Sequence, residues 1–210
     1  MSAPLPLDER LEVAAQLIKR ARIFYDIWWF YEGADTRPAL LDTMDEYSEF
    51  FRFDSHAHFV AFVVYLAGLL ETRSDTVNLR ALLQEAKDSG VVAPDEIAKA
   101  EAALSWACGL VPKVAILRNN LFSHRSAKLS YKEVFEKASI TPNQLRDLTD
   151  AGLRVTNILL TARGLQERSF HDLPKAHTQA LFNDLAKFLR LNPFVAPTPA
   201  SGHGCCSTLG

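Results

Sequence analysis

Apolar residues recur at steps of three and four along nearly the whole chain, which is the spacing of one face of an α-helix. Between Leu7 and Tyr31, for example, Leu11, Ile18 and Tyr25 follow one another at intervals of two turns. The sequence has no Asn-Gly or Asp-Gly hairpin signal, and only 9 of its 210 residues are glycine. The pattern therefore predicts an all-α protein.

We predict a single helical bundle domain of about seven helices over residues 1–192, followed by a flexible, disordered tail over residues 193–210. The tail is rich in Pro, Gly and Ser and carries no periodic apolar pattern. The predicted helices span about residues 7–31, 38–51, 55–71, 76–89, 95–124, 142–166 and 174–191, with a further short helix after residue 130.

Turn and capping signals set several of these boundaries. Ser130-Tyr131-Lys132-Glu133 and Thr141-Pro142-Asn143-Gln144 both fit the capping box, in which a hydroxyl and a Glu or Gln three residues later satisfy the first free N–H groups of a helix. Gly109 and Pro112 interrupt the stretch 95–124, where a kink is expected because proline removes a helical hydrogen bond. Asp54 or Ser55 is expected to cap the third helix.

The composition excludes some classes of function. An apolar fraction of 48% is ample for a core, and a net charge of −2 gives no overall signature of polyanion binding. The charge is nevertheless uneven, because residues 26–54 hold eight acids against two arginines. Residues 102–132 hold no acid and five bases, which are Lys113, Arg118, Arg125, Lys128 and Lys132. This distribution predicts a basic face beside an acidic one, although ordinary solvent-exposed helix faces would give the same pattern.

Cysteine usage and hydropathy point to a soluble cytoplasmic protein without membrane association. The three cysteines, Cys108, Cys205 and Cys206, form no framework of pairs, which favours a reducing compartment. The N-terminus lacks the charged-then-apolar pattern of a signal peptide. The longest apolar run, residues 59–70, is too short to span a bilayer and indicates a buried helix.

The most informative segment is Leu117-Arg118-Asn119-Asn120-Leu121-Phe122-Ser123-His124-Arg125. It places a permanent cation and a group that titrates near neutral pH within six residues, with amides between them. Those residue types suit phosphodiester cleavage without a metal. The spacing alone is not specific, since Arg52 and His58 share it. Asn119 and Asn120, polar groups inside an otherwise apolar helix, distinguish the later segment.

A structural interpretation of the same segment stays open. Arg and His are favourable in the last turn of a helix because they complement its dipole. On a straight helix Arg118 and His124 lie about 120° apart. They can meet at one phosphate only if the helix ends or distorts, or if two copies of the chain meet.

The motif resembles that of the HEPN superfamily (higher eukaryotes and prokaryotes nucleotide-binding domain), and more narrowly that of the AbiU-type proteins of the abortive-infection group. Arg118, Asn119 and His124 match the family pattern of Arg, a polar residue, a short variable run and His. The resemblance covers most of residues 7–190, but its specific part is Ile116 to Arg125. Some toxin branches carry a Tyr two residues after the His, where this chain has Ser126.

The resemblance implies a metal-independent endoribonuclease of the toxin or phage-defence type, working as a symmetric homodimer with a composite site near the twofold axis. In it, Arg118 would hold the phosphate, Asn119 would orient the histidine and His124 would act as base or acid. RNA-binding residues would be Lys113, Asn120, Arg125 and Lys128. We expect no cofactor and no metal. RNA, and an antitoxin or another protein, are the partners expected beside the second copy.

Two alternatives remain at this level. The chain can be a non-catalytic HEPN fold that binds RNA, a nucleotide or a protein, or a helical interaction protein with no nucleic-acid role. The direction of the Arg118 side chain separates the ribonuclease from the interaction protein, because the latter predicts a local salt bridge. A metal site at His56 and His58 is not expected, since side chains two apart on a helix point about 200° apart.

Overall fold

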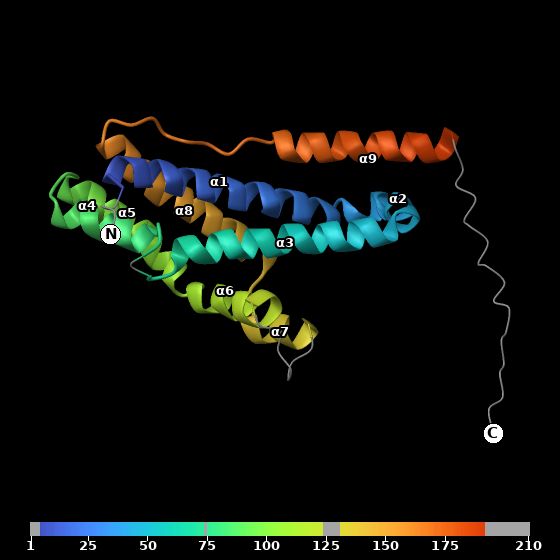
Figure 1. Cartoon of the computed structure of the whole chain (residues 1–210), viewed down its shortest axis with the longest axis horizontal. Coiled ribbons are helices and arrows are strands. Elements are labelled where there is room, and N and C mark those ends of the chain that lie inside the picture. Colours follow the sequence, from blue (N-terminus) through green and yellow to red (C-terminus); the bar gives the residue numbers. More distant parts are fainter. Residues whose placement is uncertain (1–4, 74, 124–130, 192–210) are drawn as a thin grey trace, which may run out of the picture.

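The computed structural model describes residues 5–73, 75–123 and 131–191, and every regular element in them is a helix (Figure 1). The all-α prediction is confirmed. The elements are α1 (Leu7–Glu32), the 3₁₀ turn η1 (Arg37–Ala39), α2 (Leu41–Glu46), α3 (Ser48–Leu70), α4 (Leu79–Asp88), α5 (Pro94–Cys108), α6 (Val111–Leu117), the π-helical turn η2 (Arg118–Ser123), α7 (Tyr131–Ala138), α8 (Pro142–Ala162) and α9 (Leu173–Leu191).

Two long helices, α1 and α3, lie side by side along the molecule, and α8 packs against α1 (Figure 1). The apolar face that the sequence pattern assigned to α1 is buried, since Leu11, Ile18 and Tyr25 are at most 1% exposed. α5 packs on α8, while α6 and η2 contact α3. The main core therefore lies between α1, α3 and α8, and the segment with the motif begins at its edge, where Leu117 is buried.

α1 and α8 approach closely at Gly152. A Cβ atom added there would lie 2.9 Å from Cδ1 of Ile18, so a larger residue forces the side chain of Ile18 to move. Beside this contact, the buried guanidinium of Arg22 donates to Asp26 at 2.8 Å, to Asp150 at 2.8 Å and to the hydroxyl of Thr149 at 3.2 Å. The polar network therefore fixes how α1 and α8 pack together.

The break between the second and third helices lies at Tyr47, earlier than the sequence indicated. The expected cap at Asp54 or Ser55 was wrong, because both residues lie inside α3. Their side chains are used in tertiary contacts instead: Tyr31 donates to Asp54 at 2.8 Å, and Ser55 donates to Glu32 at 2.8 Å. With the hydroxyl and carboxylate occupied by α1, nothing stops the helix at this point.

Other boundary predictions fare differently. The capping box at Thr141 is confirmed, with Thr141 and Gln144 satisfying each other's backbone N–H groups. The capping box predicted at Ser130 and the disordered tail predicted over residues 193–210 both lie outside the described residues. After α8 the chain runs along α1 to α9, whose Phe182 packs with Phe51 in a second, smaller apolar cluster (Figure 1).

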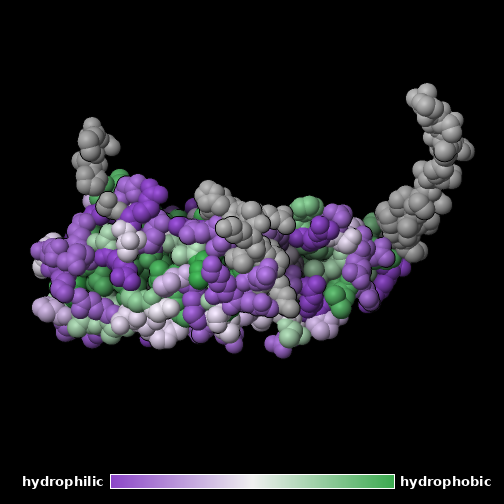
Figure 2. Space-filling model, turned by 90° about the horizontal axis from the view of Figure 1, so that it is seen from below, coloured by the Kyte–Doolittle hydropathy of each residue, from purple (hydrophilic) through white to green (hydrophobic). Residues whose placement is uncertain are grey.

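Some hydrophobic residues lie on the surface of the molecule. Figure 2, which views the molecule from the side of α6 and α7, shows hydrophobic residues in several places among hydrophilic ones. In the described part of the chain one helix, α3, is long and apolar enough to cross a membrane, and 44% of its most apolar window is buried inside the protein. The apolar run at residues 59–70 is thus part of a longer helix than the sequence suggested.

Candidate functional site

The candidate motif sits where a helix changes its winding. The interruption predicted at Gly109 and Pro112 is confirmed, because α5 ends at Cys108 and α6 begins at Val111 with a bend of 48°. α6 then continues directly into η2, in which the chain adopts π-helical geometry from Arg118 to Ser123. Single π turns are rare and often occur at functional sites. The distortion that two converging side chains would require is therefore present.

Arg118 is held by a carboxylate from another helix. Its Nη1 donates to Oε2 of Glu71 at 2.8 Å, just beyond the end of α3, and its Nε donates to Oδ1 of Asn119 at 3.2 Å. The Arg118 side chain is 33% exposed and that of Glu71 is 19% exposed. The structure therefore brings Arg118 and Asn119 together, and anchors both to the end of α3.

Two of the residues expected to bind RNA have local partners. Nζ of Lys113 donates to the carbonyl oxygen of Ser139 at 2.6 Å, which ties α6 to the end of α7. Nδ2 of Asn120 donates to the carbonyl oxygen of Ile116 at 2.8 Å, one turn back along the chain. Both side chains thus stabilise this segment. His124, Arg125 and Lys128 lie outside the described residues.

Glu71 is the site residue that sequence reasoning missed. It lies 47 residues before Arg118 and directly follows the apolar run that ends α3. The available signal was indirect: because residues 102–132 contain no acid, a carboxylate partner for Arg118 had to come from a distant part of the chain. Thr76 also approaches Glu71, with its hydroxyl 3.5 Å from Oε1.

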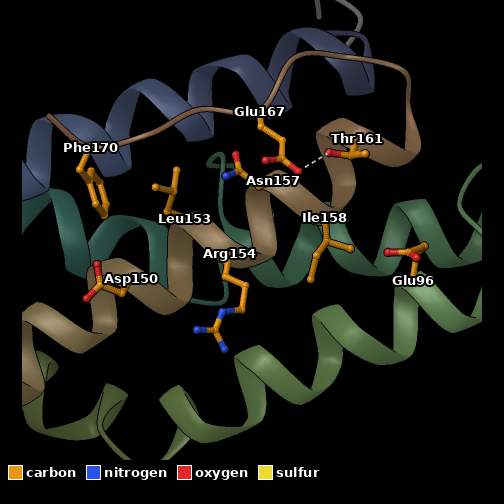
Figure 3. A pocket seen from close by; sticks show the side chains of 9 residues that line it. All are labelled: Glu96, Asp150, Leu153, Arg154, Asn157, Ile158, Thr161, Glu167 and Phe170. Carbon is orange, nitrogen blue, oxygen red and sulfur yellow. Dashed lines mark hydrogen bonds between the residues drawn. The ribbon is translucent and has the colours of Figure 1, made fainter.

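A separate pocket of about 420 Å³ opens between α5, α8 and the segment before α9 (Figure 3). None of its lining residues belongs to α6 or η2. Its polar groups largely serve the fold, since Asp150 accepts from Arg22, and Thr161 donates to Glu167 at 3.1 Å. Arg154 extends from α8 towards α5, and the acids Glu96, Asp150 and Glu167 also line the pocket (Figure 3). This acid-lined pocket is a poor match for a phosphate.

The clearest pKa shifts lie in the interior. Burial raises the pKa of the Tyr25 hydroxyl to about 12, and burial also raises the pKa of the Asp26 carboxyl, against the opposing effect of Arg22. Both groups lie on α1 and contribute to packing: the Tyr25 hydroxyl donates to the carbonyl oxygen of Pro142 at 3.1 Å. These shifts therefore report desolvation in the core and do not mark a second site.

Comparison with known proteins agrees with the motif. The sequence model of the AbiU2 family of HEPN proteins matches residues 5–179, which include the core helices, α6 and η2. The comparison finds no match among curated proteins or among solved structures. The resemblance noted at Arg118, Asn119 and His124 thus extends over most of the chain, and the protein belongs to the HEPN AbiU2 family.

Proposed function

We propose that this protein is a metal-independent endoribonuclease of the abortive-infection type, active in the cytoplasm as a toxin or in phage defence. The observation that carries the proposal is the π turn at Arg118, which joins Arg118 to Asn119 and exposes one third of the arginine side chain. Membership of the AbiU2 family supports the same assignment.

The guanidinium of Arg118 keeps donors available for a phosphate. Arginine has five N–H donors in a fixed fork. In this chain Nη1 is bonded to Glu71 and Nε to Asn119, while Nη2 makes no hydrogen bond to any described residue. A phosphate can therefore accept from Nη2 while Glu71 keeps the arginine in place. Asn119 would orient the arginine and, five residues before His124, the histidine as well.

Cleavage would proceed by attack of the RNA 2′-hydroxyl oxygen on the adjacent phosphorus. A base removes the hydroxyl proton, an acid protonates the departing 5′-oxygen, and cations stabilise the charge on the phosphorane. The products are a 2′,3′-cyclic phosphate and a 5′-hydroxyl. One histidine cannot easily serve both ends of an in-line displacement. Two copies, each supplying Arg118, Asn119 and His124, would complete the site in a homodimer.

The test is RNA cleavage by the purified protein in excess chelator. We expect cleavage with cyclic phosphate ends, and a loss of at least about a hundredfold for His124→Ala and for Arg118→Ala, because each removes a group that acts on the transition state. Arg73→Ala is the matched control, since Arg73 also pairs with an acid, Asp75 at 2.7 Å, but lies outside the motif. Unchanged cleavage in both motif variants would contradict the mechanism.

A second candidate is favoured by the Arg118–Glu71 ion pair itself. A helical interaction protein without a nucleic-acid role predicts that Arg118 serves a local salt bridge, and the side chain does form one at 2.8 Å. Such a protein would bind an antitoxin or another protein and show no affinity for RNA. Binding of a labelled single-stranded RNA at two salt concentrations distinguishes the two, because phosphate contacts weaken steeply as salt rises.

A further inference from the structure

An open groove of about 820 Å³ lies between the end of α1, α2, the first half of α3 and α7. None of the described residues that line it belongs to α6 or η2. Trp28 of α1 and Phe135 of α7 line its sides. Its floor consists of buried apolar side chains, which are Met44, Phe51 and Phe59. A concave surface of this size with a largely apolar lining is typical of a binding site.

Most polar groups of the groove are already bonded to one another. Ser55, its most buried polar residue, donates to Glu32 at 2.8 Å, and Glu32 also pairs with Arg37. Arg52 lies 3.8 Å from Glu49. Both arginines of the groove therefore have acidic partners within the chain. An occupant would gain mainly by burying apolar side chains on the floor.

Apolar side chains also surround the mouth of the groove. Leu41 and Phe53 line it and are 41% and 63% exposed, and the neighbouring Phe50 is 60% exposed. Figure 2 shows hydrophobic and hydrophilic groups side by side at this end of the molecule, on the right of the view. Exposed apolar patches that are rimmed by polar residues mark interaction sites.

The charge beside the groove is negative. Asp42, Asp45 and Glu46 of α2 are exposed and make no ion pair with any described residue. They lie within an arc of about 100° on the helix, and Asp45 also lines the groove. Asp45 and Glu46 stand in the last turn of α2, where the helix dipole opposes a carboxylate. The stability of α2 does not account for these acids, whereas a cationic partner would.

We propose that this groove is a docking site for a basic amphipathic segment of another protein. Its apolar side chains enter the groove, and its Lys or Arg side chains pair with the acids of α2. An amphipathic helix laid into an apolar groove is a recurring mode of recognition. The inference is independent of the proposed function, because the groove and the motif are formed by different residues.

Charge selects this occupant over two others. The phosphates of RNA would meet Asp42, Asp45 and Glu46, and like charges at an interface are unfavourable. Residues 193–210 of this chain contain no Lys or Arg, so they offer no partner for the acids.

Binding of a labelled synthetic helix tests the charge requirement. The probe consists of Leu and Lys, with all leucines on one face. One control peptide has Glu in place of Lys, and another has the same composition with its leucines spread around the helix. Because both apolar and charged contacts are needed, we expect the probe to bind at least about tenfold more tightly than either control.

Matched protein variants locate that binding. Asp45→Lys/Glu46→Lys should weaken it by about tenfold or more, because two attractive charges become repulsive. Glu9→Lys/Asp147→Lys makes the same change of net charge at exposed acids of α1 and α8, and should alter binding by less than about twofold. Equal weakening by the two double variants would show general attraction between opposite charges and would overturn the docking site.

Two further variants test the groove itself. Ser48 is exposed and lines the groove, so Ser48→Trp should fill it without disturbing the core, and Phe53→Ser should remove an apolar contact at its edge. We expect each to weaken binding by about fivefold or more with unchanged helicity. Trp106→Ser is the control, since Trp106 is 50% exposed in the separate groove between α5 and α8.

Other occupants of the groove give different results. Unchanged probe binding in Ser48→Trp would overturn the proposal. So would loss of RNA binding in that variant, a change in its oligomeric state, or competition with the probe by a peptide of residues 193–210. Groove-dependent binding of the probe to a protein that cleaves no RNA would uphold the docking site and refute the proposed function.

Discussion

Two arginines, each 2.8 Å from a carboxylate, occupy opposite kinds of environment in this molecule. Arg22 is 8% exposed, bonded to three side chains of α1 and α8, and covered by the ring of Phe170 at 4.7 Å. Arg118 is one-third exposed on the π turn η2, with one acid and one amide as partners. The same ion-pair distance therefore accompanies a fixed structural link in one case and an accessible cation in the other.

The difference shows that whether an arginine can bind a ligand depends more on how many of its N–H donors are already occupied than on whether it forms an ion pair. The guanidinium of Arg22 is enclosed, and burying it without Asp26 and Asp150 would be costly. Arg118 keeps Nη2 unbonded to described residues and meets solvent, so its partner can orient it without using all its donors. Variants at Arg22 should consequently change stability, whereas variants around Arg118 should change activity.

The largest expected effect is on stability at the buried arginine. Arg22→Leu leaves the half-buried carboxylate of Asp26 without its partner, so we expect the free energy of unfolding to fall by about 2–4 kcal/mol in urea titrations. The double variant Arg22→Leu/Asp26→Asn removes the unpaired charge and should recover part of that loss. If the double variant is less stable than the single one, the account of Asp26 is wrong.

At the accessible Arg118 we expect a small effect on stability and a larger one on activity. Glu71→Gln keeps the shape of the side chain but weakens its hold on Arg118, so we expect a stability change below about 1 kcal/mol. On the proposed function, RNA cleavage should fall by about tenfold, because a misplaced cation no longer matches the transition state. Urea midpoints and chelator-resistant cleavage rates are measured on the same preparation.

Asp75→Asn is the matched control for that variant, since it neutralises an acid that pairs with an exposed arginine in the segment that follows α3. Asp75→Asn should change neither the urea midpoint nor the rate of RNA cleavage. Equal cleavage by Glu71→Gln and the parent protein would show that Glu71 does not position Arg118 for catalysis.

Much of the fold could be predicted because helical periodicity is a local property. The face of α1 that contains Leu11 and Tyr25 is buried as the spacing indicates, and Thr141 caps α8 as its sequence predicts. The failure at Asp54 has a tertiary cause: a residue that caps helices in isolation is instead bonded to Tyr31, 23 residues away. Local sequence contains no sign of that contact.

The candidate site was predictable only in part for the same reason. The motif names Arg118 and Asn119 together, but adjacent side chains on a regular helix point about 100° apart, so their contact in η2 could not be predicted from the motif alone. Glu71 reaches Arg118 across 47 residues, through the packing of α6 against α3, and no short motif records such a distance. The π turn could not be predicted in detail either. The spacing of Arg118 and His124 indicated that the helix must end or distort if both are to reach one phosphate, but not that it would form a π turn.

The smallest expected effect concerns a third arginine, Arg163, whose ion pair with Asp8 at 2.8 Å lies at the surface. The hydrogen bond from Arg163 lowers the pKa of Asp8 below 3.8, so the pair stabilises the fold above that pH and the contribution is lost as pH falls through the folded pKa. Asp8→Asn should therefore cost about 0.5 kcal/mol at pH 7, an exposed pair being well screened. The difference should vanish in acid. A difference in urea midpoint that persists in acid strong enough to protonate Asp8 in the folded protein would mean that Asp8 acts through packing and not through its charge.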